Sequence, residues 1–172
     1  MWSVAIKYKE KCITFPFDAI ECVDYSKKGD LTEIFSLGTP SPSVCVELCR
    51  GLTAREAILI LSENNNLIIS GDSGSGKSTL AYGIAGFNED RKVFRFTIGN
   101  SNESKTTEDI LYFLSEVIGS VTLIIDDANV KLSFENVERI LGASQADKQI
   151  IITNTRNDFK GNSNIEQHFP KS

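Results

Sequence analysis

The chain has 172 residues, 41% of them hydrophobic and 24% charged, which is enough for one substantial core with at most a small appendage. Its 23 acidic and 18 basic residues give a net charge of −5 that no basic block offsets, which argues against broad binding of nucleic acid or anionic membranes. No apolar run approaches the ~18 residues of a membrane span, and the N-terminus lacks a secretion signal, so we expect a cytoplasmic protein.

Residues 1–50 have the pattern of a small β-rich extension. Apolar side chains alternate along Val4–Tyr8 and Ile13–Phe17, and two further strand-like segments, Ile20–Tyr25 and Leu31–Phe35, flank a loop typical of a hairpin. A proline-rich break then precedes a short helix that runs to Cys49. No catalytic set of residues occurs here, so the extension either covers an edge of the main sheet or contacts a partner.

All four cysteines lie in this extension, at Cys12, Cys22, Cys45 and Cys49. Four thiolates can hold zinc, but the C-x2-C spacing that is typical of such sites is missing. We therefore expect free thiols, some of them buried as small hydrophobic side chains, with a zinc site or a disulfide as the alternatives.

Residues 51–172 alternate between helix and strand patterns. This alternation predicts an α/β domain in three layers, in which helices cover both faces of a mainly parallel sheet. The expected helices are Thr53–Ser62, one after residue 78, one from Thr106 to Gly119 and one from Ser133, and the expected strands are Leu67–Ile69, Val93–Ile98, Val121–Ile125 and Gln149–Thr153. The polar residues 158–172 show no convincing fifth strand. Either the N-terminal region completes the sheet or a C-terminal lid is missing.

Residues 71–78 match the phosphate-binding pattern G-x-x-x-x-G-K-S/T, between an apolar strand and a helical segment. Glycine lets the backbone fold around a phosphate chain, and the amides of the loop and of the helix N-terminus then point at the anion. Lys77 is expected to reach the β- and γ-phosphates, and the Ser78 hydroxyl to ligate Mg²⁺. The residues predicted to bind the nucleotide here are Gly71, Asp72, Ser73, Gly74, Ser75, Gly76, Lys77, Ser78 and Thr79.

An acidic pair, Asp126 and Asp127, directly follows the almost wholly apolar strand Val121–Ile125. Ligands of open α/β folds bind at the carboxyl ends of the strands, so these carboxylates are expected at the same edge as the glycine loop. Asp126 would hold Mg²⁺ through water, and Asp127 would orient or deprotonate the water that attacks the γ-phosphate.

The strand near residue 150 also ends in polar residues. Asn154 or Thr153 would hydrogen-bond the γ-phosphate or the attacking water, and Arg156 would contact phosphate charge. The alternative is a plain junction between a strand and a loop.

In this order of motifs, residues 53–157 resemble the additional-strand P-loop ATPases, and within them the AAA+ and STAND groups, including the NB-ARC-type switch ATPases. Leu123–Asp127 with Ala128 is similar to the NB-ARC segment LxxDDxW, without its tryptophan, and Ile150–Arg156 is similar to the segment hhhTTR. The resemblance implies ATP and Mg²⁺ as ligands. It also implies that the strand before the glycine loop is central in the sheet, and that the strand before the acidic pair is not adjacent to it in the sequence.

One departure from the family pattern shapes the expected activity. AAA+ enzymes usually have glutamate where this chain has Asp127, which is one methylene shorter, and a misplacement of about 1 Å can cost on the order of 100-fold in rate. We therefore predict a slow ATPase, or else a nucleotide-dependent switch or assembly module that associates with itself or with a protein partner. A small-molecule kinase is less supported. The chain has no LSGGQ segment, which argues against an ABC-type ATPase, and no N-K-x-D segment, which argues against guanine specificity.

Overall fold

The computed structural model of the protein describes residues 3–8, 11–16, 20–30, 32, 39–49, 51–97, 102–155 and 166–168. In the strands at 3–8, 11–16 and 166–168 it describes the backbone alone. The first two of these strands, β1 (Ser3–Tyr8) and β2 (Lys11–Pro16), pair antiparallel as a separate hairpin, as the alternating pattern predicts.

The main sheet has six strands, and every neighbouring pair except the one at the β3 edge is parallel. From one edge to the other the strands are β3 (Ile20–Cys22), β5 (Lys92–Phe96), β6 (Val121–Ile125), β7 (Lys148–Asn154), β4 (Asn66–Ser70) and β8 (Glu166–His168). The strand before the glycine loop, β4, and the strand before the acidic pair, β6, are thus separated by β7. This order confirms the α/β class and the mainly parallel sheet.

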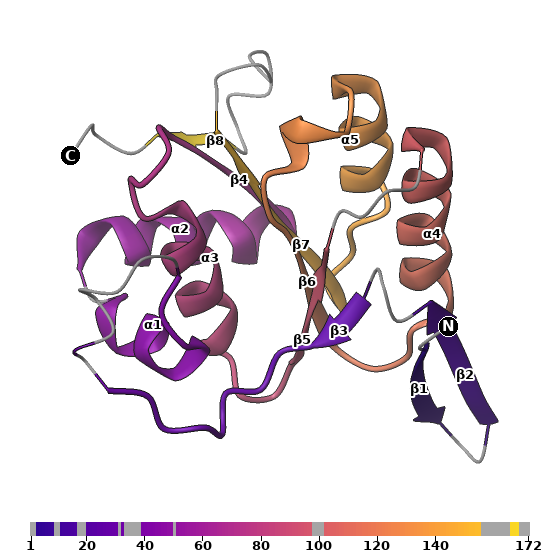
Figure 1. Ribbon diagram of the computed structural model, residues 1–172, viewed down its shortest axis with the longest axis horizontal. Coiled ribbons are helices and arrows are strands. Elements are labelled where there is room, and N and C mark those ends of the chain that lie inside the picture. Colours follow the sequence, from indigo (N-terminus) through magenta and orange to yellow (C-terminus); the bar gives the residue numbers. More distant parts are fainter. Residues whose placement is uncertain are drawn as a thin grey trace.

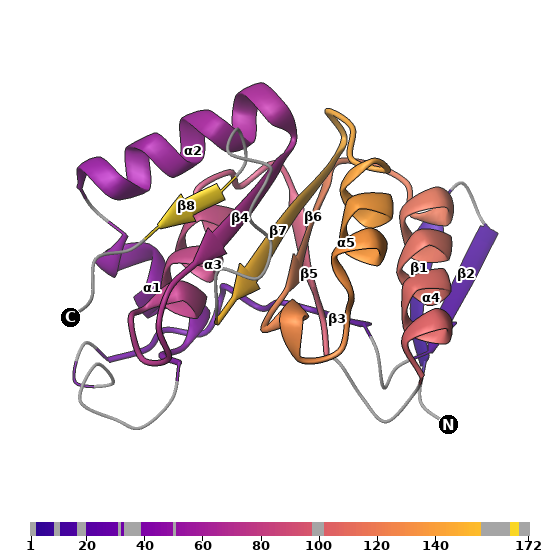
Figure 2. The ribbon, with the colours of Figure 1, turned by 90° about the horizontal axis from the view of Figure 1, so that it is seen from above.

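Helices cover both faces of this sheet and complete the three layers (Figures 1 and 2). The helices α1 (Pro42–Leu48), α2 (Leu52–Asn64) and α3 (Lys77–Gly86) lie over one face, and α4 (Glu103–Glu116) and α5 (Phe134–Leu141) over the other. A short 3-10 helix, η2 (Ala128–Val130), follows β6. None of the helices in the described ranges is long and apolar enough to cross a membrane.

The central strands are apolar on both faces because both faces are covered. All five residues of β6 are buried, and successive side chains enter different cores. Leu123 and Ile125 pack with α4 and α5, whereas Ile124 packs with α2 and α3. This alternation follows from the two-residue period of a strand, and it explains why an uninterrupted apolar run, and not an alternating one, marks β6.

The start of α4 differs from its expected position. The predicted start near Thr106 is late, because the helix begins at Glu103 and its cap is Asn102, whose side chain accepts a hydrogen bond of 2.8 Å from the Lys105 amide. The helix also ends at Glu116, before the predicted Gly119. By contrast, Ser133 caps α5 as predicted and accepts from the Asn136 amide.

Strand β8 corrects the expectation that residues 158–172 contain no fifth strand. Its backbone pairs in parallel with β4, so that Glu166 lies opposite Ile68. Strand β8 has only three residues, too few to show a two-residue period, so the sequence pattern gives no signal for it. At the far edge, β3 pairs with β5, with Ile20 opposite Phe96, whereas its expected hairpin partner, 31–35, lies largely outside the described residues.

Residues 39–49 lie against α3, the helix that follows the glycine loop, and not apart from the α/β layers. Helix α1 packs on α3, the Tyr25 hydroxyl donates a hydrogen bond of 2.6 Å to the Tyr82 carbonyl, and the Cys49 thiol lies 3.6 Å from the Thr79 carbonyl. The division into an extension of residues 1–50 and a core of residues 51–172 stays a prediction.

Glu103 joins the beginnings of α4 and α5, and this contact predicts a pH-dependent stability. Its carboxylate accepts hydrogen bonds from the Ser133 amide, at 2.5 Å, and the Asn136 side chain, at 2.6 Å. These bonds lower the pKa of Glu103 below its ordinary value of 4.5. A lowered folded-state pKa stabilises the protein above the unfolded-state value, and this contribution disappears as the pH falls through the folded-state pKa.

We therefore expect Glu103→Gln to melt at a lower temperature than the unmodified protein at pH 7, by a small margin because the carboxylate is exposed. The difference in Tm should close as the pH falls below the ordinary value of 4.5 and through the lowered folded-state pKa of Glu103. Glu116→Gln, at the exposed other end of α4, is the matched control and should show no such pH-dependent difference. A Glu103→Gln difference that stays constant down to low pH would contradict the role of the carboxylate.

Candidate functional site

The glycine loop between β4 and α3 has the backbone that its sequence requires. Gly74 and Gly76 have φ angles of 79° and 91°, a left-handed conformation that side chains other than glycine rarely adopt. A Cβ atom on Gly71 would lie 2.7 Å from the Ser75 hydroxyl, so the close turn also needs glycine at that position. Helix α3 follows at once and directs its N-terminus into the loop.

Two polar groups in this loop are poised for an anion. Lys77 is only 6% exposed, and its ammonium group donates a hydrogen bond of 2.8 Å to the Asp72 carbonyl, across the loop. The Ser75 hydroxyl is buried and has no hydrogen-bond partner among the described residues. A buried hydroxyl without a partner costs free energy, and phosphate oxygens would supply that partner.

Ser78 and Asp126, 48 residues apart in the chain, meet at the mouth of the loop. The Ser78 hydroxyl lies 2.8 Å and 2.9 Å from the two carboxylate oxygens of Asp126. A hydroxyl and a carboxylate are hard oxygen donors that fit Mg²⁺, which proteins bind through few side chains together with phosphates and water. The described residues contain no group of three or more acidic, histidine or cysteine side chains that would hold a metal alone.

Asp127 occupies an unusual backbone conformation at the end of β6. Its φ and ψ are 50° and 47°, in the left-handed region, and its side chain is exposed. The Asp127 amide donates a hydrogen bond of 2.8 Å to the Thr153 hydroxyl, and its carboxylate accepts one of 3.0 Å from the Thr155 hydroxyl. The acidic pair is therefore bonded to the end of β7, the strand that lies between it and the loop strand.

Thr153 is fully buried, and its hydroxyl is engaged with the acidic pair. The Thr153 hydroxyl donates a hydrogen bond to the Asp126 carboxylate and accepts one from the Asp127 amide. These two bonds use the hydrogen and one lone pair of the hydroxyl. The expected role of Thr153 in reading a γ-phosphate is thus less direct than its role in fixing Asp126.

The other predicted residues on this strand have separate surroundings. Asn154 is fully buried, and its carbonyl accepts a hydrogen bond of 3.2 Å from the Gly71 amide, which ties β7 to the loop. Arg156 lies outside the described residues. Two residues that the sequence analysis did not single out, Thr155 and Asn129, also reach this place, and the Thr155 amide donates a hydrogen bond of 3.1 Å to the Asn129 side chain.

Strand periodicity does not identify Thr155, because β7 ends at the residue before it. Its signal in the sequence is its place within the segment similar to hhhTTR. No signal of this kind identifies Asn129, which lies in the short helix η2.

Two cavities border the loop and the acidic pair. One, of about 390 Å³, lies where α1 and α2 meet the loop and is lined by the apolar side chains of Leu48, Leu52, Ala54 and Leu80, with Cys49, Gly51, Thr53, Ser75, Gly76 and Thr79. The other, of about 440 Å³, lies on the β5 side of the acidic pair and is lined by Tyr82, Arg95, Phe96, Thr97, Asp126, Asp127 and Val130. Burial, and then the nearby Asp126 charge, raises the pKa of Tyr82 to about 12, so this phenol is neutral at pH 7.

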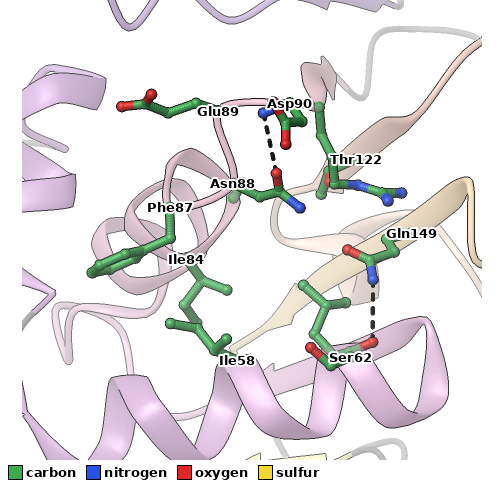
Figure 3. Close-up of a pocket in the computed structure, with 12 residues that line it drawn as sticks. Ile58, Ser62, Ile84, Phe87, Asn88, Glu89, Asp90, Thr122 and Gln149 are labelled. Carbon is green, nitrogen blue, oxygen red and sulfur yellow. Dashed lines mark hydrogen bonds between the residues drawn. The ribbon is translucent and has the colours of Figure 1, made fainter.

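A third cavity, of about 440 Å³, lies at the opposite end of the parallel strands (Figure 3). Ile58 and Ile84 point toward each other there, and Gln149 donates a hydrogen bond of 3.4 Å to the Leu61 carbonyl. At the edge of this cavity, the Arg91 guanidinium donates hydrogen bonds to the Val121 and Ala146 carbonyls. This cavity is therefore separate from the phosphate loop, which follows the carboxyl end of β4.

The three cysteines whose side chains are described are free, as expected. Cys22 is exposed, Cys45 and Cys49 are buried, and burial raises the pKa of Cys49 to about 11. The Cys12 side chain lies outside the described part of the chain. Within that part, no cysteine contributes to a cluster of metal-binding side chains.

A family model described as Novel STAND NTPase 3 matches residues 52–165, which is two thirds of the chain. The match confirms the resemblance to the STAND group. No curated protein is similar enough to count as a relative. A solved structure of PCH-2 from C. elegans is similar at 16% identity, with a TM-score of 0.43, and the aligned part covers 74% of this chain and 41% of that chain.

Proposed function

This chain belongs to the family of Novel STAND NTPase 3, and from that premise we propose that it binds ATP with Mg²⁺ and hydrolyses it slowly to ADP and phosphate. The observation that carries the proposal is the direct contact between Ser78 and Asp126 beside a loop of the phosphate-binding conformation. A hydroxyl and a carboxylate in contact, beside a loop that carries a buried lysine, are the groups that nucleotide phosphates with Mg²⁺ need.

In this proposal each residue has a separate role. The loop amides and the N-terminus of α3 hold the phosphates, and the Lys77 ammonium neutralises the charge that develops on them. Ser78 and Asp126 would hold Mg²⁺, directly and through water, and the ion when bound adds positive charge against the phosphate oxygens. Asp127 orients the water whose oxygen forms the new bond to the γ-phosphorus, as the bond from that phosphorus to the oxygen of ADP breaks.

The apolar cavity beside the loop supports adenine as the base. Its walls can pack against a purine ring, because Leu48, Leu52 and Leu80 contribute apolar surface. Guanine presents two N–H groups that a carboxylate would bind, and none of the described lining residues carries a carboxylate.

A second candidate function is a nucleotide-held switch or assembly module with almost no turnover. The observation that favours it is the aspartate at position 127, whose carboxylate is one methylene shorter than that of the glutamate usual in AAA+ enzymes. Such a module would retain ATP or ADP tightly and change its association with itself or a protein partner when the nucleotide changes. A cytoplasmic location belongs to both versions of the proposal.

Steady-state ATP turnover per molecule, measured over a wide range of protein concentration, tests this proposal. Lys77→Ala serves as the blank, because it removes the phosphate-binding ammonium group. We expect a low rate above the blank, and a rate per molecule that rises with concentration if neighbouring copies complete the site. Turnover equal to the blank at every concentration would overturn the hydrolase function, and tight ATP retention in the same samples would favour the switch.

A further inference from the structure

Among the described residues, Asp127 is one of only two that are not glycine and have a positive φ angle. The other, Asn65, ends α2 in the left-handed conformation that asparagine commonly adopts at helix ends. Asp127 instead lies at the carboxyl end of a buried central strand, where this conformation costs free energy and persists only if neighbouring groups hold it. The neighbours that hold Asp127 are therefore informative.

Four side chains form what we call the acidic-turn clamp: Asp127, Asn129, Thr153 and Thr155. Thr153 accepts the Asp127 amide hydrogen at 2.8 Å, and Asn129 accepts the Thr155 amide hydrogen at 3.1 Å. The Thr155 hydroxyl then donates to the Asp127 carboxylate at 3.0 Å. Each of these bonds joins the turn after β6 to the end of β7.

The Thr155 hydroxyl differs from the rest of the clamp in what it holds. The turn backbone is already fixed by Thr153 and by the Val130 amide, which donates a hydrogen bond of 3.1 Å to the Asp127 carbonyl. Strand β7 ends at Asn154, so Thr155 lies just beyond the strand and takes no part in its pairing. Its bond acts on the carboxylate alone, where it restricts rotation of the side chain and leaves the second oxygen to accept from water.

We propose that Thr155 is a positioning residue: its hydroxyl, with its backbone anchored by Asn129, sets the direction of the Asp127 carboxylate for the attacking water. This inference rests on the proposed hydrolase function and adds to it a residue outside the contact with nucleotide. It explains how an aspartate, shorter than a glutamate by one methylene, is kept in one orientation at an exposed turn.

The first test compares turnover of Thr155→Val, which replaces the hydroxyl by a methyl group, with Thr155→Ser, which retains it. The matched control is Thr97→Val, at the carboxyl end of β5, whose side chain lines the same cavity as Asp127. At saturating ATP and Mg²⁺ we expect kcat of Thr155→Val to fall at least about tenfold with KM little changed. Thr155→Ser and Thr97→Val should stay within about threefold of the unmodified protein.

Three kinetic results would overturn the proposal. An unchanged kcat in Thr155→Val would mean that the hydroxyl positions nothing, and an equal loss in Thr155→Ser would assign the effect to the methyl group. A raised kcat would make Thr155 a restraint on Asp127 and not an aid.

A second readout needs no nucleotide and separates this inference from the proposed function. Three-bond NMR couplings of Asp127 report whether its side chain occupies one rotamer or several. We expect single-rotamer couplings in the unmodified protein, Thr155→Ser and Thr97→Val, and averaged couplings in Thr155→Val. Single-rotamer couplings in Thr155→Val would overturn the inference whether or not the protein hydrolyses ATP. Absent turnover in the unmodified protein would overturn the hydrolase function alone, and the couplings would still decide whether Thr155 holds the carboxylate.

Discussion

Replacing Lys77 by methionine is expected to weaken ATP binding on the order of 100-fold or more while the folded state is retained. A charged hydrogen bond contributes about 1.5–3 kcal/mol, and the lysine of this loop is expected to make such bonds to two phosphate groups. Methionine keeps a long, unbranched, apolar stem in the 6% exposed channel that Lys77 occupies. Among the described residues, the ammonium group makes one hydrogen bond, to the Asp72 carbonyl, so its removal breaks few contacts within the fold.

The measurement is the Kd for ATP with Mg²⁺ by calorimetric titration, together with Tm in the absence of nucleotide. Lys92→Met is the matched control, because Lys92 is an exposed lysine at the opposite end of the parallel strands. Its Kd should equal that of the unmodified protein. Equal ATP affinity in Lys77→Met would mean that the loop does not bind phosphate through this lysine, and the nucleotide site would have to be placed elsewhere.

The meeting of Ser78 with Asp126 is the part of the site that follows most directly from the sequence. The glycine loop is a local pattern, and an apolar run followed by Asp126 is another. In a parallel sheet the carboxyl ends of all strands lie at one edge, so the two patterns are expected to meet there without any knowledge of strand order. The observed contact of 2.8 Å between the Ser78 hydroxyl and Asp126 agrees with this reasoning.

The acidic-turn clamp could not be predicted in the same way. It requires β6 and β7 to be neighbours in a fixed register, with Ile125 opposite Ile152, which no local pattern specifies. It also requires Asp127 to adopt a left-handed backbone, and aspartate, unlike glycine, does not signal that conformation. The bond between Thr155 and Asp127 is thus a tertiary property of two strand ends.

The pairing of the edge strands was equally hard to predict, although the strand expected within Ile20–Tyr25 is present and lies at one edge of the main sheet. Strand β8 is three residues long and pairs with β4 through its backbone. Strand β3 has one buried side chain, Ile20, and its partner, β5, lies about 70 residues later in the chain. Short segments of this kind take their structure from the edge that they join.

Replacing Gly83 by alanine is expected to destabilise the protein by about 2–3 kcal/mol, against the direction that helix propensity predicts. Alanine within a helix is ordinarily favoured over glycine by about 1 kcal/mol. Gly83, however, lies where α3 packs on α1, and an added Cβ atom would lie 2.0 Å from the Cys49 thiol and 2.6 Å from the Cys45 carbonyl. A backbone carbonyl cannot rotate away as a side chain can, so α1 has to move.

Chemical denaturation of Gly83→Ala beside Gly142→Ala measures the sign of this effect. A Cβ atom on Gly142, at the end of α5, would come no closer than 3.3 Å to its nearest neighbour, so this control should change the free energy of unfolding by less than about 0.5 kcal/mol. Adding Cys49→Ala to Gly83→Ala removes the thiol but leaves the Cys45 carbonyl, and should recover only part of the loss.

A stabilised Gly83→Ala would show that α1 does not pack on α3 in solution. A single cooperative transition with the expected loss would place residues 39–49 in the same folding unit as the nucleotide loop, because a separate extension would tolerate the displacement without cost to the core.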